Sequence, residues 1–253
     1  MPFEPVTSEK LSRGVVRQIE ELILRGVLSP GDRLPAERDL AERLEVSRPS
    51  LREALGALQE SGLLTAKAGA GVFVADVLGS AFSPALVELF SRHDRALFDT
   101  LAFRRDMEGL AAERAAREGS AADLAVIAAI FGQMEEGRQA PKAEAALDAR
   151  FHLAIVEASH NVILLHMMRS MYDLLRQGVF YNRQAMFERG SASEDLLEQH
   201  RGINDALQRR DAAGARAAVV AHLDYVEAAL TDQRRARENE AVARRRLQQV
   251  SGG

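Results

Sequence analysis

The sequence has no cysteine and no tryptophan, and it contains only three tyrosines. The lack of cysteine excludes disulfide bonds, thiolate metal sites and thiol nucleophiles, and it is compatible with a reducing compartment. No apolar run reaches the roughly 18 residues that a membrane-spanning helix needs. The N-terminal segment also lacks the apolar stretch of a secretory signal. We therefore expect a soluble, cytoplasmic protein that does not bind a membrane.

A strong positive charge is also missing. The chain has a formal net charge of −4, and its first 76 residues hold ten Lys and Arg against twelve Asp and Glu. Any part of the chain that binds a nucleic acid must therefore use a local cluster of arginines rather than a general positive field.

Helix-forming residues dominate what is present, chiefly Ala, Leu, Arg and Glu. The length of 253 residues favours two domains of ordinary size. A stretch with Gly79, Ser80, Ser83 and Pro84 interrupts the helical pattern and suggests a linker. We predict an N-terminal domain at residues 1–76, a linker at 77–85, an all-helical domain at 86–235 and a basic tail, expected to be a frayed helix, at 236–253.

The N-terminal pattern predicts three helices and a β-hairpin. Apolar residues at helical spacing mark helices over 8–26 and 36–44, and Ser47 caps a third helix that ends near Glu60. Two short apolar runs, LLTAK and VFVA, then flank a glycine-bearing tip. Three helices followed by a hairpin within about 70 residues are typical of a winged helix-turn-helix.

The remainder of the chain is predicted to be helical throughout. Its breaks fall at Gly119, Pro141, His160-Asn161, Gly190 and Asp211. We expect helices over 86–91, 94–118, 120–137, 142–159, 161–188, 194–209 and 211–238. The predicted fold class is therefore mostly α: the winged helix-turn-helix joined to an all-α antiparallel helical bundle.

The segment PAERDLAERLEVSRPSLREAL has the features of a DNA-reading unit. Two short helices meet at a tight turn, and the second carries Arg48 and Arg52 in its N-terminal half. Arginine can bond guanine bidentately, and the amides at a helix N-terminus suit phosphate. Arg38 could join the same face, and Lys67 and Gly69 could lie against the DNA backbone or the minor groove.

A carboxylate and three imidazoles in the second half of the chain could form a metal site. Asp148 and His152 stand four residues apart on one predicted helix, and His200 and His222 lie on two later helices. Side chains from three helices can converge inside a bundle on a divalent ion. From spacing alone, a surface pair of Asp148 and His152 is the commoner outcome.

The whole chain resembles the GntR family of regulators, in the FadR subgroup that carries the FCD ligand domain. The similarity is carried by GDRLPAERDLAERLEVSRPSLREAL, by the ESGLL hinge and by GVFV. It implies a homodimer that binds a short inverted repeat in double-stranded DNA. It also implies base and phosphate contacts by Arg38, Arg48 and Arg52, backbone contacts by Ser47 and Ser50, and entry of Gly69 into the minor groove.

The hairpin departs from the pattern of the family. Its tip usually reads basic residue or Gln, Gly, Gly, Gly, Thr, whereas this sequence has Lys67, Ala68, Gly69, Ala70, Gly71 and Val72. Because Ala68 and Val72 remove polar contacts, the contribution of the wing to specificity is in doubt.

The resemblance also supplies a ligand set in the second half. Regulators with this domain carry an Asp and a His one turn apart and one His on each of the last two long helices. Asp148, His152, His200 and His222 match these places, which implies a divalent metal, zinc first and nickel or manganese as alternatives. Within the family the chain is similar to regulators of pyruvate, lactate and glycolate metabolism, so a small carboxylate effector is implied.

Arg104 is the residue that we expect to pair with such an anionic effector. An internal ion pair between Arg104 and Glu108, one turn apart, is the alternative, and both could hold. We thus predict a ligand-responsive regulator, with a repressor as the first expectation and an activator as the alternative. One alternative is a DNA-binding protein with a purely structural metal. A metal-dependent enzyme is another, which the lack of an HExxH motif and of a glycine-rich phosphate loop argues against.

Overall fold

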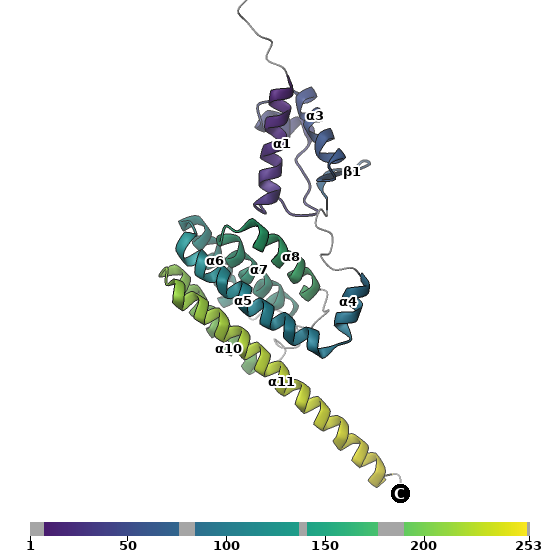
Figure 1. The fold of residues 1–253 in the computed structure, drawn as a ribbon, viewed down its shortest axis with the longest axis vertical. Helices are drawn as coiled ribbons and strands as arrows, with labels where there is room; N and C mark the ends of the chain where they lie inside the picture. The colour runs from purple at the N-terminus through teal and green to yellow at the C-terminus, as the bar shows by residue number, and fades with distance from the viewer. Residues whose placement is uncertain (1–7, 76–83, 137–140, 177–189, 252–253) are drawn as a thin grey trace, which may run out of the picture. The chain divides into compact units, whose positions relative to one another are not determined.

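The chain folds into two compact units, residues 1–81 and 82–253. The computed structural model describes residues 8–75, 84–136, 141–176 and 190–251 (Figure 1). As predicted, the fold is mostly helical, with one small hairpin after the first three helices. Among the described residues, no helix is long and apolar enough to cross a membrane.

In its described part, residues 8–75, the first unit contains three helices and a two-stranded antiparallel sheet. Its elements are α1 (Ser8–Leu24), α2 (Glu37–Arg43), α3 (Arg48–Glu60), β1 (Leu64–Lys67) and β2 (Gly71–Val74). The helices exist because each buries one apolar stripe. Val15, Ile19 and Ile23 of α1 recur at helical spacing and pack on the stripe of α3, which includes Leu51 and Leu55.

The start of α3 is fixed by its cap. The Ser47 hydroxyl oxygen accepts a hydrogen bond from the backbone N–H of Ser50 at 3.2 Å, and Pro49 occupies the first turn. The chain leaves α3 through Gly62, whose φ of +78° lies in the left-handed region that glycine adopts without strain.

The hairpin has a strict register, in which Leu64 pairs with Val74 and Lys67 pairs with Gly71. Leu64 and Val74 point into the core of the unit. The turn before α2 adds to the sheet, because Arg33 forms an isolated antiparallel bridge with Phe73. The sequence predicted only a turn at that point.

The second unit is built entirely of helices in its described part. These are α4 (Pro84–Ser91), α5 (Asp94–Glu118), α6 (Ala121–Glu135), α7 (Pro141–Ala158), α8 (Val162–Arg176), α10 (Gly190–Gln208) and α11 (Ala212–Ser251). The proposed linker, 77–85, falls mostly outside the described residues, and its last two residues belong to α4. The predicted helix over 161–188 is described only as far as Arg176.

Helices α5 and α11 lie side by side along most of α5 (Figure 1). Small residues allow this close approach: Ala112 and Ala115 of α5 and Ala215 of α11 are all fully buried. A Cβ added at Gly109 would meet Val220 at 3.4 Å, which shows how little room is left between the two helices.

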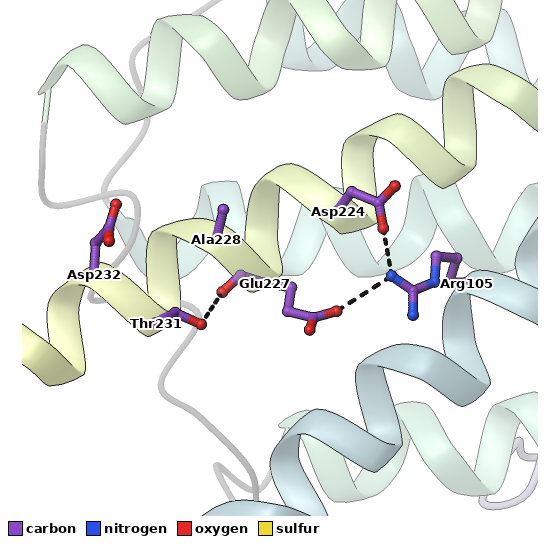
Figure 2. A pocket seen from close by; sticks show the side chains of 6 residues that line it. All are labelled: Arg105, Asp224, Glu227, Ala228, Thr231 and Asp232. Atoms are coloured by element: carbon purple, nitrogen blue, oxygen red, sulfur yellow. Dashed lines mark hydrogen bonds and ion pairs between the residues drawn. The ribbon is translucent and has the colours of Figure 1, made fainter.

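Surface ion pairs join the same two helices. Nη1 of Arg105 on α5 contacts the carboxylate of Asp224 and lies 3.2 Å from Glu227 Oε2, both on α11 (Figure 2). Beyond this point α11 continues to Ser251, past the other helices of the unit in Figure 1. The side chains from Arg234 to Val250 are exposed, and they include most of the segment predicted as a basic tail.

Candidate metal centre and nucleic-acid interface

The four residues predicted as metal ligands meet inside the helical unit. Asp148 and His152 lie one turn apart on α7, His200 lies on α10, and His222 lies on α11. One potential ligand atom from each lies within 4.8 Å of all the others. Their exposed fractions are 3%, 1%, 0% and 2% in that order. The alternative of a surface pair between Asp148 and His152 is therefore wrong.

The distances within this cluster are short. Asp148 Oδ1 lies 3.0 Å from His200 Nε2 and 3.6 Å from His152 Nε2. The Nε2 atoms of His152 and His200 are 3.3 Å apart. The three imidazoles thus present ring nitrogens to one small volume beside a carboxylate oxygen.

Aromatic packing holds the rings in place. The His152 and His222 rings stack with centroids 5.1 Å apart, and the His200 and His222 centroids are 4.6 Å apart. The ring of Phe151 meets His152 and His200 edge-on, at 5.8 and 5.2 Å between centroids. Aromatic rings prefer such edge-to-face arrangements, so these contacts favour one orientation of each imidazole ring.

Two oxygen atoms approach the outer nitrogens of the cluster. Glu108 Oε2 of α5 lies 2.9 Å from His152 Nδ1, an ion-pair distance whose alignment falls short of a linear hydrogen bond. Gln199 Oε1 of α10 lies 2.9 Å from His222 Nδ1. In both rings the Nδ1 atom therefore faces an oxygen of a neighbouring helix.

Arg104 is buried beside the cluster and pairs with Glu108. Its Nε donates to Glu108 Oε1 at 2.6 Å, and its guanidinium carbon lies 5.6 Å from the centre of the Tyr172 ring. Neither partner is more than 1% exposed. The internal ion pair considered in the sequence analysis is therefore present. Whether Arg104 also binds an effector stays a prediction.

The protonation states in this site follow from burial and charge. Burial opposes ionisation of Glu108, but the charges of Arg104 and His152 outweigh it and hold the pKa of Glu108 well below its usual range. Burial lowers the pKa of His200 and, with the neighbouring imidazoles, lowers that of His222 further. Burial also disfavours charge on His152, yet Glu108 and Asp148 raise its pKa above the ordinary value.

This donor set fits a divalent transition metal. Three imidazoles and one carboxylate are the ligands that zinc, nickel and manganese take in proteins, and neutral imidazoles have the lone pair that a metal requires. The depressed pKa values of His200 and His222 keep those two rings neutral. The chemistry and the convergence of the four residues are thus those of a metal site.

In the first unit, the predicted DNA-contacting residues gather around the start of α3. Arg48 is exposed in its first turn, and Arg52 is exposed one turn later, with Nε donating to Glu37 of α2 at 2.8 Å. This ion pair connects α2 to α3. Ser50 is 3% exposed and its hydroxyl lies 2.8 Å from that of Ser47. The structure thus gives the two serines a capping role, and their phosphate contacts stay predictions.

The other predicted DNA contacts lie on α2 and the hairpin. Arg38 is exposed on α2, where its Nε lies 3.2 Å from Asp39 Oδ1. The ammonium group of Lys67 lies 4.7 Å from the centre of the Phe73 ring across the hairpin. Gly69 at the tip has a φ of +72°, and a Cβ added there would meet no atom of the described residues within 4 Å, its chain neighbours aside. All three positions are open to solvent.

Comparison with known families decides the identity of the chain. The description "Bacterial regulatory proteins, gntR family" matches residues 11–74, and the description "FCD domain" matches residues 99–225. A protein of Escherichia coli (strain K12) named "Putative L-lactate dehydrogenase operon regulatory protein" is 37% identical over 226 residues, covering 87% of this chain and 86% of its own length. This chain belongs to the GntR family.

Other relatives of this GntR-family regulator agree. The Glc operon transcriptional activator of Escherichia coli (strain K12) is 35% identical over 223 residues, covering 86% of this chain and 88% of its own length. A solved structure described as Streptococcus agalactiae GntR has a TM-score of 0.51 at 24% identity, covering 88% of this chain and all of that one. The latter shows a shared fold. The family membership makes the chain a transcription regulator and not an enzyme.

Sequence reasoning missed three residues around the Asp148, His152, His200 and His222 cluster of this GntR-family regulator. Gln199 was overlooked, Phe151 was not singled out, and Glu108 was paired only with Arg104. Each approaches a predicted ligand histidine of another helix. The position of Gln199 directly before His200 gave no signal, because adjacent helical residues face different directions.

Proposed function

We propose that this GntR-family chain is a ligand-responsive, DNA-binding transcription regulator, and that a small carboxylate at a metal centre reduces its affinity for its operator. Residues 1–76 would bind DNA and residues 86–235 would sense the ligand. The observation that carries the proposal is the buried cluster of Asp148, His152, His200 and His222, whose ligand atoms lie within 4.8 Å of one another.

Zinc is the ion that the donor set favours most, since three imidazoles and a carboxylate in a small buried site suit its low coordination numbers. Nickel and manganese are the alternatives. When bound, such an ion supplies a Lewis-acidic position for an oxygen of a carboxylate. The four residues of the cluster would hold it.

Arg104 is the group of this chain that we expect to recognise the anionic effector. It is buried, it pairs with Glu108, and its charge is close enough to lower the pKa of His222. A guanidinium can bind two carboxylate oxygens at once. The relatives named for L-lactate dehydrogenase and Glc operons support a 2-hydroxy or 2-oxo acid such as lactate, glycolate or pyruvate.

For the first unit, we propose that α3 reads the major groove and that the exposed hairpin reaches the backbone or minor groove. Two such units, one from each protomer of a homodimer, would bind the halves of a short inverted repeat. Binding of the effector must favour one arrangement of the protein over another, because a ligand shifts an equilibrium only through unequal affinity for its states. We propose that the favoured arrangement binds DNA less well.

Metal content and thermal shift test the sensor. The protein, purified without chelator, is expected to contain about one zinc per chain, and lactate, glycolate or pyruvate is expected to raise its melting temperature by mass action. His200→Ala should lose the zinc. His160→Ala is the matched control, since His160 is exposed and pairs with Asp123. Full zinc content in His200→Ala would place the metal elsewhere.

DNA binding is tested with a duplex selected by the protein from a random pool. Arg48→Ala and Arg52→Ala are expected to abolish the mobility shift of that duplex, while Arg25→Ala, an exposed arginine at the end of α1, should leave it unchanged. Each bidentate contact to a base contributes about 1–3 kcal/mol of discrimination. Retained binding by both reading-helix variants would refute the assignment of α3.

A second candidate is a regulator whose metal is purely structural. The observation in its favour is that all four ligand residues are buried, as in closed structural zinc sites. In this case zinc would stabilise the fold, yet no carboxylate would alter the mobility shift. A mobility shift that stays unchanged across a panel of small carboxylates would favour this candidate over the sensor.

A further inference from the structure

On the side away from the cluster, the His152 ring faces the carboxylate of Glu108, which is not one of the four predicted metal ligands. Glu108 Oε2 lies 2.9 Å from His152 Nδ1, on the side of the ring away from the cluster. Glu108 is itself 1% exposed, and Arg104 holds it through contacts of 2.6 Å from Nε and 3.4 Å from Nη2. A buried carboxylate with two partners of this kind has a fixed position.

The chemistry of an ionised carboxylate restricts the histidine. A carboxylate can only accept hydrogen bonds, so the His152 nitrogen that faces Glu108 must carry a proton. The proton on Nδ1 leaves the lone pair of a neutral ring on Nε2, which faces His200 Nε2 at 3.3 Å and Asp148 Oδ1 at 3.6 Å. A partner that accepts from the other nitrogen of a ligand histidine fixes its tautomer and increases its basicity.

The contact on His222 differs in one respect. Its Nδ1 faces the side-chain amide of Gln199, at 2.9 Å from Oε1. An amide can either accept or donate, since its oxygen and nitrogen exchange places when the group turns over. Gln199 is therefore compatible with both tautomers of His222, whereas Glu108 is compatible with only one tautomer of His152.

We propose that Glu108 is a positioning residue of the metal centre, which holds His152 in the Nδ1-protonated tautomer with Nε2 available to the metal, and which Arg104 in turn holds in place. This inference rests on the proposed metal site. It assigns the Arg104–Glu108 pair a role beyond packing, because the pair fixes the direction of a ligand atom on the neighbouring helix α7.

The test compares Glu108→Gln with Glu113→Gln, a control on the same helix. Glu113 pairs with Arg117 and Arg216 and lies away from the cluster. Zinc affinity is measured by competition with a chelator of known affinity. Glu108→Gln is expected to bind zinc about 10- to 100-fold more weakly, and Glu113→Gln is expected to match the wild type. Equal zinc affinity of all three proteins would overturn the inference.

A second readout does not depend on metal. Nitrogen-15 NMR of the protein stripped of metal by a chelator, at a pH high enough for His152 to be neutral, reports which of its ring nitrogens carries the proton. We expect protonated Nδ1 in the wild type and a mixture of tautomers in Glu108→Gln. If the wild type binds no zinc and the tautomer of His152 still differs in this way between the wild type and Glu108→Gln, the proposed metal site fails while the role of Glu108 stands. A wild-type His152 protonated only on Nε2 would refute the role of Glu108.

A further variant covers the case in which Glu108→Gln fails to fold. The single change leaves the charge of Arg104 buried without its carboxylate, which is destabilising. The double variant Arg104→Met/Glu108→Gln removes both charges and keeps the amide beside His152. It is expected to fold and to show the same loss of zinc affinity, and wild-type affinity in this variant would overturn the inference.

Discussion

Phe151 packs against two of the predicted ligand histidines, and its replacement by alanine is the most informative perturbation of the helical unit. The side chain is fully buried on α7. Its ring meets the rings of His152 and His200 edge-on and lies 6.2 Å from that of Phe131. The change would therefore remove both core packing and the restraint on two ligand rings.

The size of the effect can be worked from this burial. A buried phenylalanine removes roughly 150–250 Å² from water, which at about 25 cal/mol per Å² corresponds to roughly 4–6 kcal/mol as an upper bound. Alanine retains part of that area, and the cavity left behind adds a further cost. We expect Phe151→Ala to lower the free energy of unfolding by about 3–5 kcal/mol.

Urea unfolding in the presence of a chelator measures this loss without any contribution from metal. Phe131→Ala is the matched control, since Phe131 is also buried but none of its described ring contacts is with an imidazole. Both variants should lose similar stability. Only Phe151→Ala should also weaken zinc binding, by about tenfold.

Two results would refute this reasoning. One is a loss of stability below about 1 kcal/mol in Phe151→Ala, which would mean that the ring does not fill the core. The other is an equal loss of zinc affinity in Phe131→Ala. If the alanine variants do not fold, the leucine variants at both positions serve the same comparison at a cost of about 1–2 kcal/mol each.

Three further predictions concern the histidines of the site, the cap of α3 and the surface ion pairs of Arg105. In the presence of a chelator, the free energy of unfolding should fall as the pH drops below about 6.5. The cause is that His200 and His222 take up protons in the unfolded chain but stay neutral in the folded protein, where their pKa values are lowered. Each such proton accounts for up to about 1.4 kcal/mol per pH unit. The raised pKa of His152 acts above this range: it adds stability as the pH falls toward about 6.5 and leaves the trend below that pH unchanged. Urea unfolding that shows stability rising as the pH drops below about 6.5 would contradict the prediction. Ser47→Ala should cost about 1 kcal/mol of stability through loss of the α3 cap, measured by the same method, and an unchanged midpoint would exclude the cap. Arg105→Ala should cost no more than about 1 kcal/mol, because its ion pairs are partly solvated, and a larger loss would indicate a role in packing.

Features that depend only on the local sequence, such as a helix cap or the spacing of two residues on one helix, could be predicted. Ser47 was expected as a cap because a serine precedes a proline and an apolar stripe at helical spacing, and the structure confirms the cap. Asp148 and His152 were placed on one face of a helix by their spacing alone. The convergence of these two with His200 and His222 required the family resemblance, since spacing cannot show how three helices turn toward one another.

Contacts across helices could not be predicted in the same way. Glu108 precedes His152 by 44 residues, and their approach depends on the rotation of α5 against α7, which the local pattern does not determine. Arg33 bridges to Phe73 for a similar reason, because a turn sequence carries no signal of the strand beside it.

The last part of α11 is helical, as predicted for the basic tail. Residues 236–251 are rich in Ala, Arg and Glu and contain neither proline nor glycine. The helix therefore runs without a break from Ala212 to Ser251, across the predicted boundary at 238. High helix propensity, rather than any buried stripe, accounts for this segment, since its side chains are exposed.

The origin of the cluster in three separate helices has a consequence for the order in which the protein matures. The complete set of ligand atoms exists only when α7, α10 and α11 have all docked, so a chain in which one of these helices has not docked lacks at least one of the four ligand residues. At the proposed metal site, tight binding would thus depend on complete tertiary assembly, because His222 of the last long helix completes the ligand set. Newly made chains would acquire metal late, and a truncation within α11 before His222 would yield a helical but metal-poor protein.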